Sequence, residues 1–154
     1  MQFKHLDINS GLTNNQVKTI YEDSNGFIWV GTVNGLNRFD GYSVKVFRKS
    51  NNEEFSLPDN NINEIYEDQH GKIWLNTGSG LAIFDPTTEK FISGNQINQI
   101  YKSLPLSNIE NIFCDNDKQL WIFHRNTGAY CYGANPDSVK HLRIGHELMP
   151  HPIS

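Results

Sequence analysis

The chain repeats one segment three times in tandem. Residues 12–40 and 57–85 align without gaps at a spacing of 45 residues, and 14 of their 29 positions are identical. A third, more divergent copy covers residues 104–132, where Trp121 follows Trp74 by 47 residues. Because this agreement far exceeds chance, the copies arose by duplication, and each must form the same structural unit.

Each copy is predicted to be a small antiparallel sheet of four strands. The apolar segments are short, rich in Val, Ile, Phe, Tyr and Trp, and interrupted by Gly, Asn and Asp too often for paired helices. In the first copy the strands are expected at residues 17–23, 27–32, 35–40 and 42–48. The second strand is apolar on both faces and the fourth alternates, which favours an order running from the hub outward. A period near 45 residues with four strands per unit predicts an all-β fold of β-propeller blades.

The repeats divide the chain into about three blades of an incomplete propeller. The expected blades are residues 12–48, 57–93 and 104–144, with 1–11 as the tail of a preceding outer strand and 145–154 leading toward a missing blade. Propellers close with about four to eight blades, so such an arc leaves two blade faces uncovered. Exposed apolar faces of this kind predict self-association or cover by a partner.

The residues that recur in the copies are predicted to have structural roles. The tryptophans are expected to pack between adjacent blades: Trp29, Trp74 and Trp121. Aspartates at the strand ends and the glycines that follow favour capped hairpin turns over calcium loops, which need more oxygen ligands. These turn residues are Asp23, Asp68, Asp115, Gly26 and Gly71.

Composition excludes several classes of function. The net charge of −4 is scattered, which disfavours nucleic-acid binding, and no apolar stretch is long enough to predict a membrane span. The first residues do not read as a signal peptide. Cys114 and Cys131 fall on the first and third strands of one sheet, too far apart to pair, so free buried thiols are expected. No catalytic residue, metal site or cofactor is predicted.

Ligand-binding residues are expected in the loops, where propellers carry function. The loops between second and third strands, called b–c loops below, share one face with the loops that connect successive blades. They offer polar side chains able to hydrogen-bond a sugar: Asn34, Ser79, Arg125 and Asn126. His124 replaces the threonine of the other copies, and either a ligand contact or a solvent-facing loop residue fits this position.

The run I-Y-E-D-x-x-G-x-I-W-x-x-T-x-x-G-L-x-x-F-D resembles the two-component regulator propeller repeat. The third copy departs from this pattern at Lys118, Phe123 and His124. The resemblance implies the periplasmic sensor region of a hybrid two-component histidine kinase, in which such repeats build seven-bladed propellers. It further implies a non-catalytic segment that helps to detect an external ligand, typically an oligosaccharide.

Two other classes of function remain open from the residues alone. One is a generic propeller that holds a protein partner and no small ligand. The other is a propeller lyase, which would need a His and Glu cluster with a metal at the hub. The sequence supplies no such convergent set, which disfavours the lyase.

Overall fold

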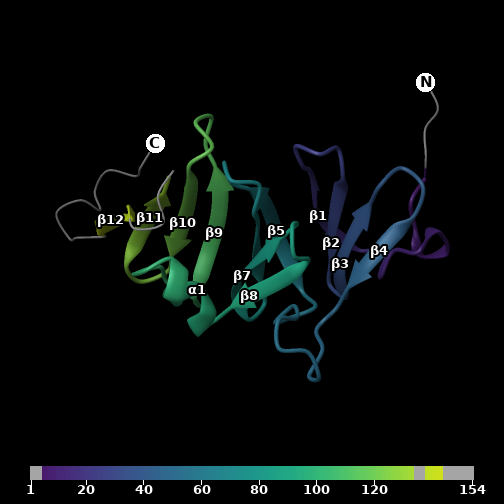
Figure 1. Ribbon diagram of the computed structural model, residues 1–154, viewed down its shortest axis with the longest axis horizontal. Coiled ribbons are helices and arrows are strands. Elements are labelled where there is room, and N and C mark those ends of the chain that lie inside the picture. Colours follow the sequence, from purple (N-terminus) through teal and green to yellow (C-terminus); the bar gives the residue numbers. More distant parts are fainter. Residues whose placement is uncertain (1–4, 134–137, 144–154) are drawn as a thin grey trace.

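The computed structural model describes residues 5–133 and 138–143, which form three antiparallel sheets lying side by side (Figure 1). Blade 1 contains β1 (Val17–Glu22), β2 (Ile28–Thr32), β3 (Gly35–Phe39) and β4 (Val44–Phe47). Blade 2 contains β5 (Ile62–Glu67), β6 (Ile73–Thr77), β7 (Gly80–Asp85) and β8 (Lys90–Ser93). Blade 3 contains β9 (Ile109–Cys114), β10 (Leu120–His124), β11 (Gly128–Tyr132) and β12 (Lys140–Arg143). Neighbouring strands are consecutive in the chain, so the expected all-β, four-stranded unit is confirmed.

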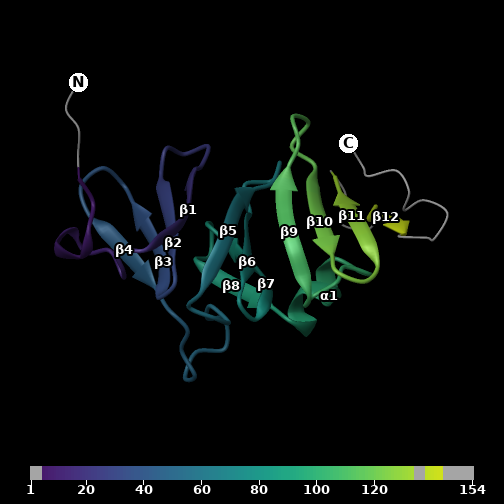
Figure 2. The ribbon, with the colours of Figure 1, turned by 180° about the vertical axis from the view of Figure 1, so that it is seen from behind.

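The three blades form an open arc around a hub of inner strands (Figure 2). Strand β5 packs against β1 and β2, and β9 packs against β5 and β6. The outer strands β4, β8 and β12 lie away from this hub (Figures 1 and 2). The strand order therefore runs from the hub outward, and the described part of the chain does not close into a ring.

The core between blades 1 and 2 is built around Trp29. This indole is fully buried and meets Phe84 of blade 2 edge-on, with ring centroids 5.2 Å apart. Phe47 of β4 stacks on the same indole at 6.0 Å. Leu57, from the loop that connects the two blades, is also fully buried in this cluster. Apolar side chains from both sheets and from their connection therefore share one interface.

The core between blades 2 and 3 repeats this arrangement around Trp74. Tyr132 of β11 lies 5.7 Å from its indole. Tyr132 and Phe84 occupy matching positions, each opposite the first residue of the second strand in its own sheet. A further ring, Tyr101, approaches Trp74 at 5.1 Å from the connection between the blades. The two interfaces therefore use the same positions of the repeat but fill them with different side chains.

Trp121 differs from the other two tryptophans because no sheet covers it among the described residues. It is partly exposed and stacks on Phe113 of its own blade, with ring centroids 6.3 Å apart and planes at 8°. Phe113 also stacks on Phe123 at 5.6 Å. We call Phe113, Trp121 and Phe123 the aromatic face of blade 3.

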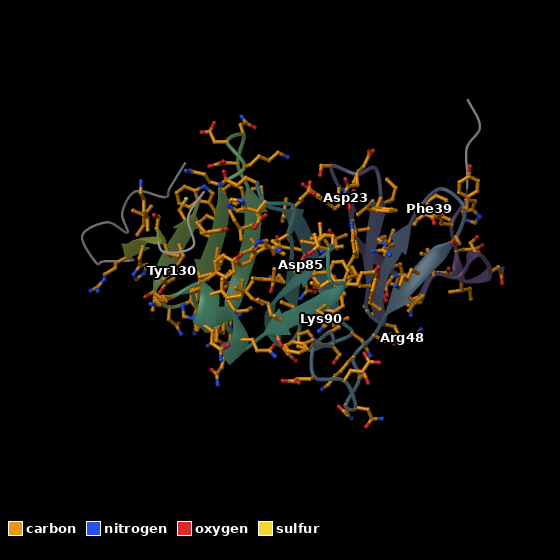
Figure 3. The ribbon with its side chains drawn as sticks, viewed as in Figure 1. Asp23, Phe39, Arg48, Asp85, Lys90 and Tyr130 are labelled. Atoms are coloured by element: carbon orange, nitrogen blue, oxygen red, sulfur yellow. The ribbon has the colours of Figure 1, made fainter. Side chains whose placement is uncertain are left out.

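One aspartate in each blade joins the first turn to the tryptophan. In blade 1, Asp23 (labelled in Figure 3) accepts backbone N–H bonds from Asn25 and Phe27 through Oδ1. Its Oδ2 accepts the indole N–H of Trp29 at 2.8 Å. The carboxylate therefore caps the hairpin and fixes the ring that fills the core.

The same aspartate contacts recur in the other two blades. Asp68 holds the indole N–H of Trp74 at 2.8 Å, and Asp115 holds that of Trp121 at 3.0 Å. Lys118 replaces the turn glycine of the third copy, and the turn is retained because this lysine adopts a φ of 61°. The indole bond was not anticipated from the sequence.

Carboxylates also join neighbouring blades. Glu67, at the end of β5, accepts the backbone N–H of Ser24 at 2.9 Å and its hydroxyl at 2.8 Å. At the equivalent position of blade 3, Cys114 donates its thiol to the backbone oxygen of Glu67 at 3.2 Å. Glu64 instead links blades 2 and 3, since its Oε1 accepts the N–H of Ile112 at 3.0 Å.

Two segments differ from the sequence-based expectation. The described part of the expected N-terminal strand tail, residues 5–11, contains the short 3-10 helix η1 (Ile8–Ser10), because Asp7 accepts the N–H groups of Asn9 and Ser10. The connection between blades 2 and 3 contains an unexpected helix, α1 (Asn95–Ile100). The expected lead segment 145–154 lies outside the described residues. No helix in the described chain is long and apolar enough to cross a membrane.

The close contact at Gly80 gives a stability prediction. A Cβ on Gly80 would lie 2.1 Å from the backbone oxygen of Leu106, and its φ of 113° is unfavourable for other residues. Gly80→Ala should therefore lower the free energy of unfolding by about 3 kcal/mol in urea denaturation. Gly71→Ala is the matched control, because its φ is 79° but nothing lies within 4 Å of the added atom. Gly71→Ala should lower the free energy of unfolding by about 1 kcal/mol. Equal losses of unfolding free energy at the two sites would show that the contact with the Leu106 oxygen is not the cause.

The aspartate–tryptophan bonds predict unequal effects in blades 2 and 3. Asp68→Ala leaves the N–H of the fully buried Trp74 without a partner and should cost about 3 kcal/mol in unfolding free energy. Asp115→Ala leaves the N–H of the partly exposed Trp121, which water can satisfy, and should cost about 1 kcal/mol. Urea denaturation followed by tryptophan fluorescence measures both. A larger loss for Asp115→Ala would contradict the role of burial.

Candidate ligand-binding groove

A polar groove lies between blades 2 and 3, on the face formed by the b–c loops and the loops that connect the blades. Its volume is about 330 Å³, which is at the lower end of the range for small-ligand sites. The b–c loop of blade 2 forms one wall, and residues 107–109, entering blade 3, form another. The polar lining comprises Asn63, Asn76, Thr77, Ser79, Ser107, Asn108 and Arg125.

Backbone hydrogen bonds hold the loops that form these walls. Gly78 donates its N–H to the oxygen of Asn61 at 3.0 Å, and Arg125 donates to that of Asn108 at 3.0 Å. These two pairs occupy equivalent places in blades 2 and 3, so each b–c loop rests on the loop that enters its own blade. The groove is therefore bordered by backbone that is already hydrogen-bonded.

Acidic side chains orient the polar groups of the groove. The hydroxyl of Ser79 donates to Asp59 Oδ2 at 2.8 Å, and the Nε of Arg125 donates to Glu110 Oε1 at 2.8 Å. Arg125 is the only ionisable residue among the described residues that line the groove. Amides, hydroxyls and one guanidinium can donate and accept hydrogen bonds, but they provide no acid–base pair. The arrangement suits binding more than proton transfer.

The structure brings together two of the four residues singled out from the sequence. Ser79 and Arg125 both line the groove. Asn34 lies in blade 1, where its side chain donates to the oxygen of Thr13 at 3.5 Å. Asn126 is exposed and does not line the groove.

Sequence reasoning missed the groove residues outside the b–c loops. Asn63 and Asn76 come from inner strands, and Ser107 and Asn108 come from the loop that enters blade 3. A signal for Asn63 was available, because the repeat places polar Lys18 and Asn63 at matching positions of β1 and β5. Lys18 donates to the side-chain oxygen of Asn63, which joins blades 1 and 2 beside the groove.

A second hollow of about 430 Å³ is more open and lies along the inner strands. Its lining is largely aromatic and includes Tyr66, Phe113 and Phe123 together with Glu64. Burial, followed by the nearby charge of Glu64, raises the pKa of Tyr66 above its usual value. The hollow offers few converging polar groups, so the polar groove is the better candidate for a specific ligand.

The two cysteines are free and unpaired. Burial is the main cause that raises the pKa of the Cys114 thiol to about 11, and the charge of Asp68 adds to it. Burial likewise raises the pKa of Cys131. Both thiols are therefore protonated at neutral pH and are poor nucleophiles. Within residues 5–133 and 138–143, no three His, Cys, Asp or Glu side chains gather into a metal site.

Comparison with known proteins relates two of the repeats to a described family. Residues 11–34 and 56–79 match the family model of the two component regulator propeller. A stretch of 55 residues is 38% identical to Histidine kinase P4 of Formosa agariphila. The alignment covers 36% of this chain and 4% of that protein, so the chain corresponds to a small part of its relative.

Solved structures give the same relationship over most of the chain. The extracellular domain of BT3049 from B. thetaiotaomicron, described as a hybrid two component system, matches with a TM-score of 0.72 and 26% identity over 91% of this chain. The extracellular domain of BT4673 from the same organism matches with a TM-score of 0.60 and 27% identity over 82%. This chain covers 20% and 18% of those two domains, respectively. A virginiamycin B lyase from Staphylococcus aureus, at 19% identity and a TM-score of 0.57, shares the fold.

Proposed function

We propose that this chain helps a two-component regulator to detect an external oligosaccharide. Two of its repeats match the two component regulator propeller, and the chain is similar to the extracellular domain of a hybrid two component system. On this proposal the chain is non-catalytic and belongs to the periplasmic part of a hybrid histidine kinase anchored in the inner membrane. The homology supports the extracellular placement, and the groove supports the binding role.

The observation that carries the proposal is the convergence of polar groups, all uncharged except Arg125, from two blades in one groove. Asn76 and Ser79 come from blade 2, and Asn108 and Arg125 come from blade 3 or the loop that enters it. Sugar hydroxyls both donate and accept hydrogen bonds, so amide, hydroxyl and guanidinium groups match them in chemistry. A ligand in this groove would touch both blades at once.

Contact with two blades suggests how binding is transmitted. Blades 2 and 3 share a buried interface, so a ligand between their loops would favour one relative placement of the two sheets. A ligand shifts a conformational equilibrium only by its difference in affinity for the two states. We therefore propose that the ligand selects one arrangement of the sensor region and so alters signalling to transcription across the membrane.

Binding of oligosaccharides by the purified chain, first on a glycan array and then by calorimetry, tests the groove. Arg125→Ala should weaken binding of a retained glycan by roughly tenfold or more, because a charged hydrogen-bond donor is lost from the groove wall. Asn34→Ala is the matched control, since this loop asparagine lies outside the groove. Its affinity should stay within about twofold of the original.

Two results would contradict the proposal. A folded chain that retains no glycan would remove this groove as an oligosaccharide site. Equal losses for Arg125→Ala and Asn34→Ala would indicate that binding occurs elsewhere on the loop face.

The aromatic face of blade 3 supports a second role, in protein association. Phe113 is 36% exposed and Leu142, on the outer strand of the same sheet, is 52% exposed. Blade 1 carries exposed apolar residues at the other end of the arc, including Ile20, which is 65% exposed. We propose that copies of this chain associate through these faces in solution, because each would bury apolar surface that water otherwise contacts.

Sedimentation velocity over a range of protein concentrations tests this association. The chain should show a concentration-dependent increase in sedimentation coefficient, and Phe113→Lys should reduce it by placing a charge on the aromatic face. Tyr42→Lys is the control, because Tyr42 is 94% exposed and lies in the turn between β3 and β4. A monomer at every concentration would refute the proposal.

A further inference from the structure

The b–c loop of blade 3 is closed by a histidine side chain. The Nδ1 of His124 accepts the backbone N–H of Asn126 at 3.2 Å and that of Thr127 at 3.1 Å. The hydroxyl of Thr127 lies 2.8 Å from the same nitrogen. Backbone N–H groups can only donate, so Nδ1 must carry no proton, and His124 is neutral with its proton on Nε2.

In the other two blades, a threonine hydroxyl, which does not titrate, accepts the backbone N–H of the b–c loop. In blade 1, Thr32 Oγ1 accepts the N–H of Asn34 at 3.0 Å and donates to the oxygen of Gly35 at 3.2 Å. In blade 2, Thr77 Oγ1 accepts the N–H of Ser79 at 3.2 Å. The loop of blade 3 is one residue longer than these, and the longer imidazole side chain reaches across it. The chain thus contains two pH-insensitive copies of the cap to compare with His124.

The His124 cap is part of a hydrogen-bond network at the outer edge of blade 3. The hydroxyl of Thr127 lies 2.9 Å from that of Tyr130, a residue of β11 labelled in Figure 3. His141 of β12 places Nε2 at 2.7 Å from the backbone oxygen of Thr127, which can only accept, so this nitrogen carries a proton. Its ring stacks on Tyr130 with centroids 4.1 Å apart. Protonation preserves the His141 bond but abolishes the acceptor of His124.

The charged and titratable groups near His124 come from the other three strands of the blade and from the b–c loop itself. Arg125 follows it in the chain and pairs with Glu110 of β9. Arg143 of β12 lies opposite Gly128, the residue that pairs with His124 in β11. Tyr130 and His141 complete the surroundings. Glu110 is therefore the only carboxylate in this group of neighbours, and Arg125 already engages it.

We propose that His124 is a proton-controlled cap that holds the b–c loop of blade 3 closed when neutral and releases it when protonated. A protonated Nδ1 would direct its N–H at two backbone N–H groups and repel them. Because only the open loop accommodates a proton on Nδ1, lowering the pH favours opening. Arg125, the next residue, lines the polar groove, and its position changes when the loop opens. The cap itself depends on no assumption about the groove's ligand.

Nuclear magnetic resonance of the ¹⁵N-labelled chain between pH 8 and pH 5 tests the cap. At pH 8 the nitrogen shifts of His124 should identify the tautomer protonated on Nε2. The amide signals of Asn126 and Thr127 should then move with the same midpoint as the His124 ring. Their protection against hydrogen exchange, corrected for intrinsic rates, should fall by about fivefold or more at pH 5. The amides of Asn34 and Ser79, capped by threonine, should show neither change.

Two variants distinguish the effect of protonating His124 from that of protonating His141. His124→Thr installs the cap of the other blades and should abolish the pH response of the Asn126 and Thr127 amides. His141→Gln should leave that response in place. The proposal is overturned if Nδ1 of His124 carries the proton at pH 8, if the two amides do not follow the His124 ring, or if their response disappears in His141→Gln. The first two criteria use the original chain and apply even if His124→Thr fails to fold.

Discussion

The structure depends on a buried tryptophan whose indole N–H is held by an aspartate of the same blade. A single carboxylate, such as Asp68, closes the first hairpin, satisfies the polar atom of the ring and so allows the rest of Trp74 to enter an apolar interface. A buried indole N–H without this partner would cost free energy. Turn, strand and interface are therefore specified together, and the spacing of six residues between aspartate and tryptophan is the same in all three copies.

The fold could be predicted almost completely because its determinants are local and repeated. Alternating apolar residues and turn glycines gave the strands of blade 1 to within two residues at each boundary. Helix α1 was not predictable, since it spans six residues without a side-chain cap and is stabilised by burying Ile97 beside Trp74. Helix η1 depends on Asp7, whose capping contacts carry no periodic signal.

The candidate site could be predicted only in part, because the groove exists only once two blades meet. The b–c loops could be identified as polar, and two of the residues selected there, Ser79 and Arg125, line the groove. The sequence did not indicate that Asn34 would be engaged within its own blade, with its backbone oxygen accepting from Arg48. Asn76 lies in β6, a strand for which the sequence predicted only a structural role. It lines the groove because the loop that enters blade 3 lies opposite it.

The carboxylate contacts between blades bear on how related repeats avoid mispairing during folding. Sheets with such similar sequences could join in the wrong order, a characteristic failure of repeat proteins. Glu67 accepts hydrogen bonds from Ser24 in a turn of blade 1, whereas Glu64 accepts the backbone N–H of Ile112 within a strand of blade 3. The two interfaces between blades therefore require different hydrogen-bond donors. Blade 2 therefore offers a different carboxylate contact to each of its two neighbours, which favours the correct order of the sheets at the margins of the apolar interfaces.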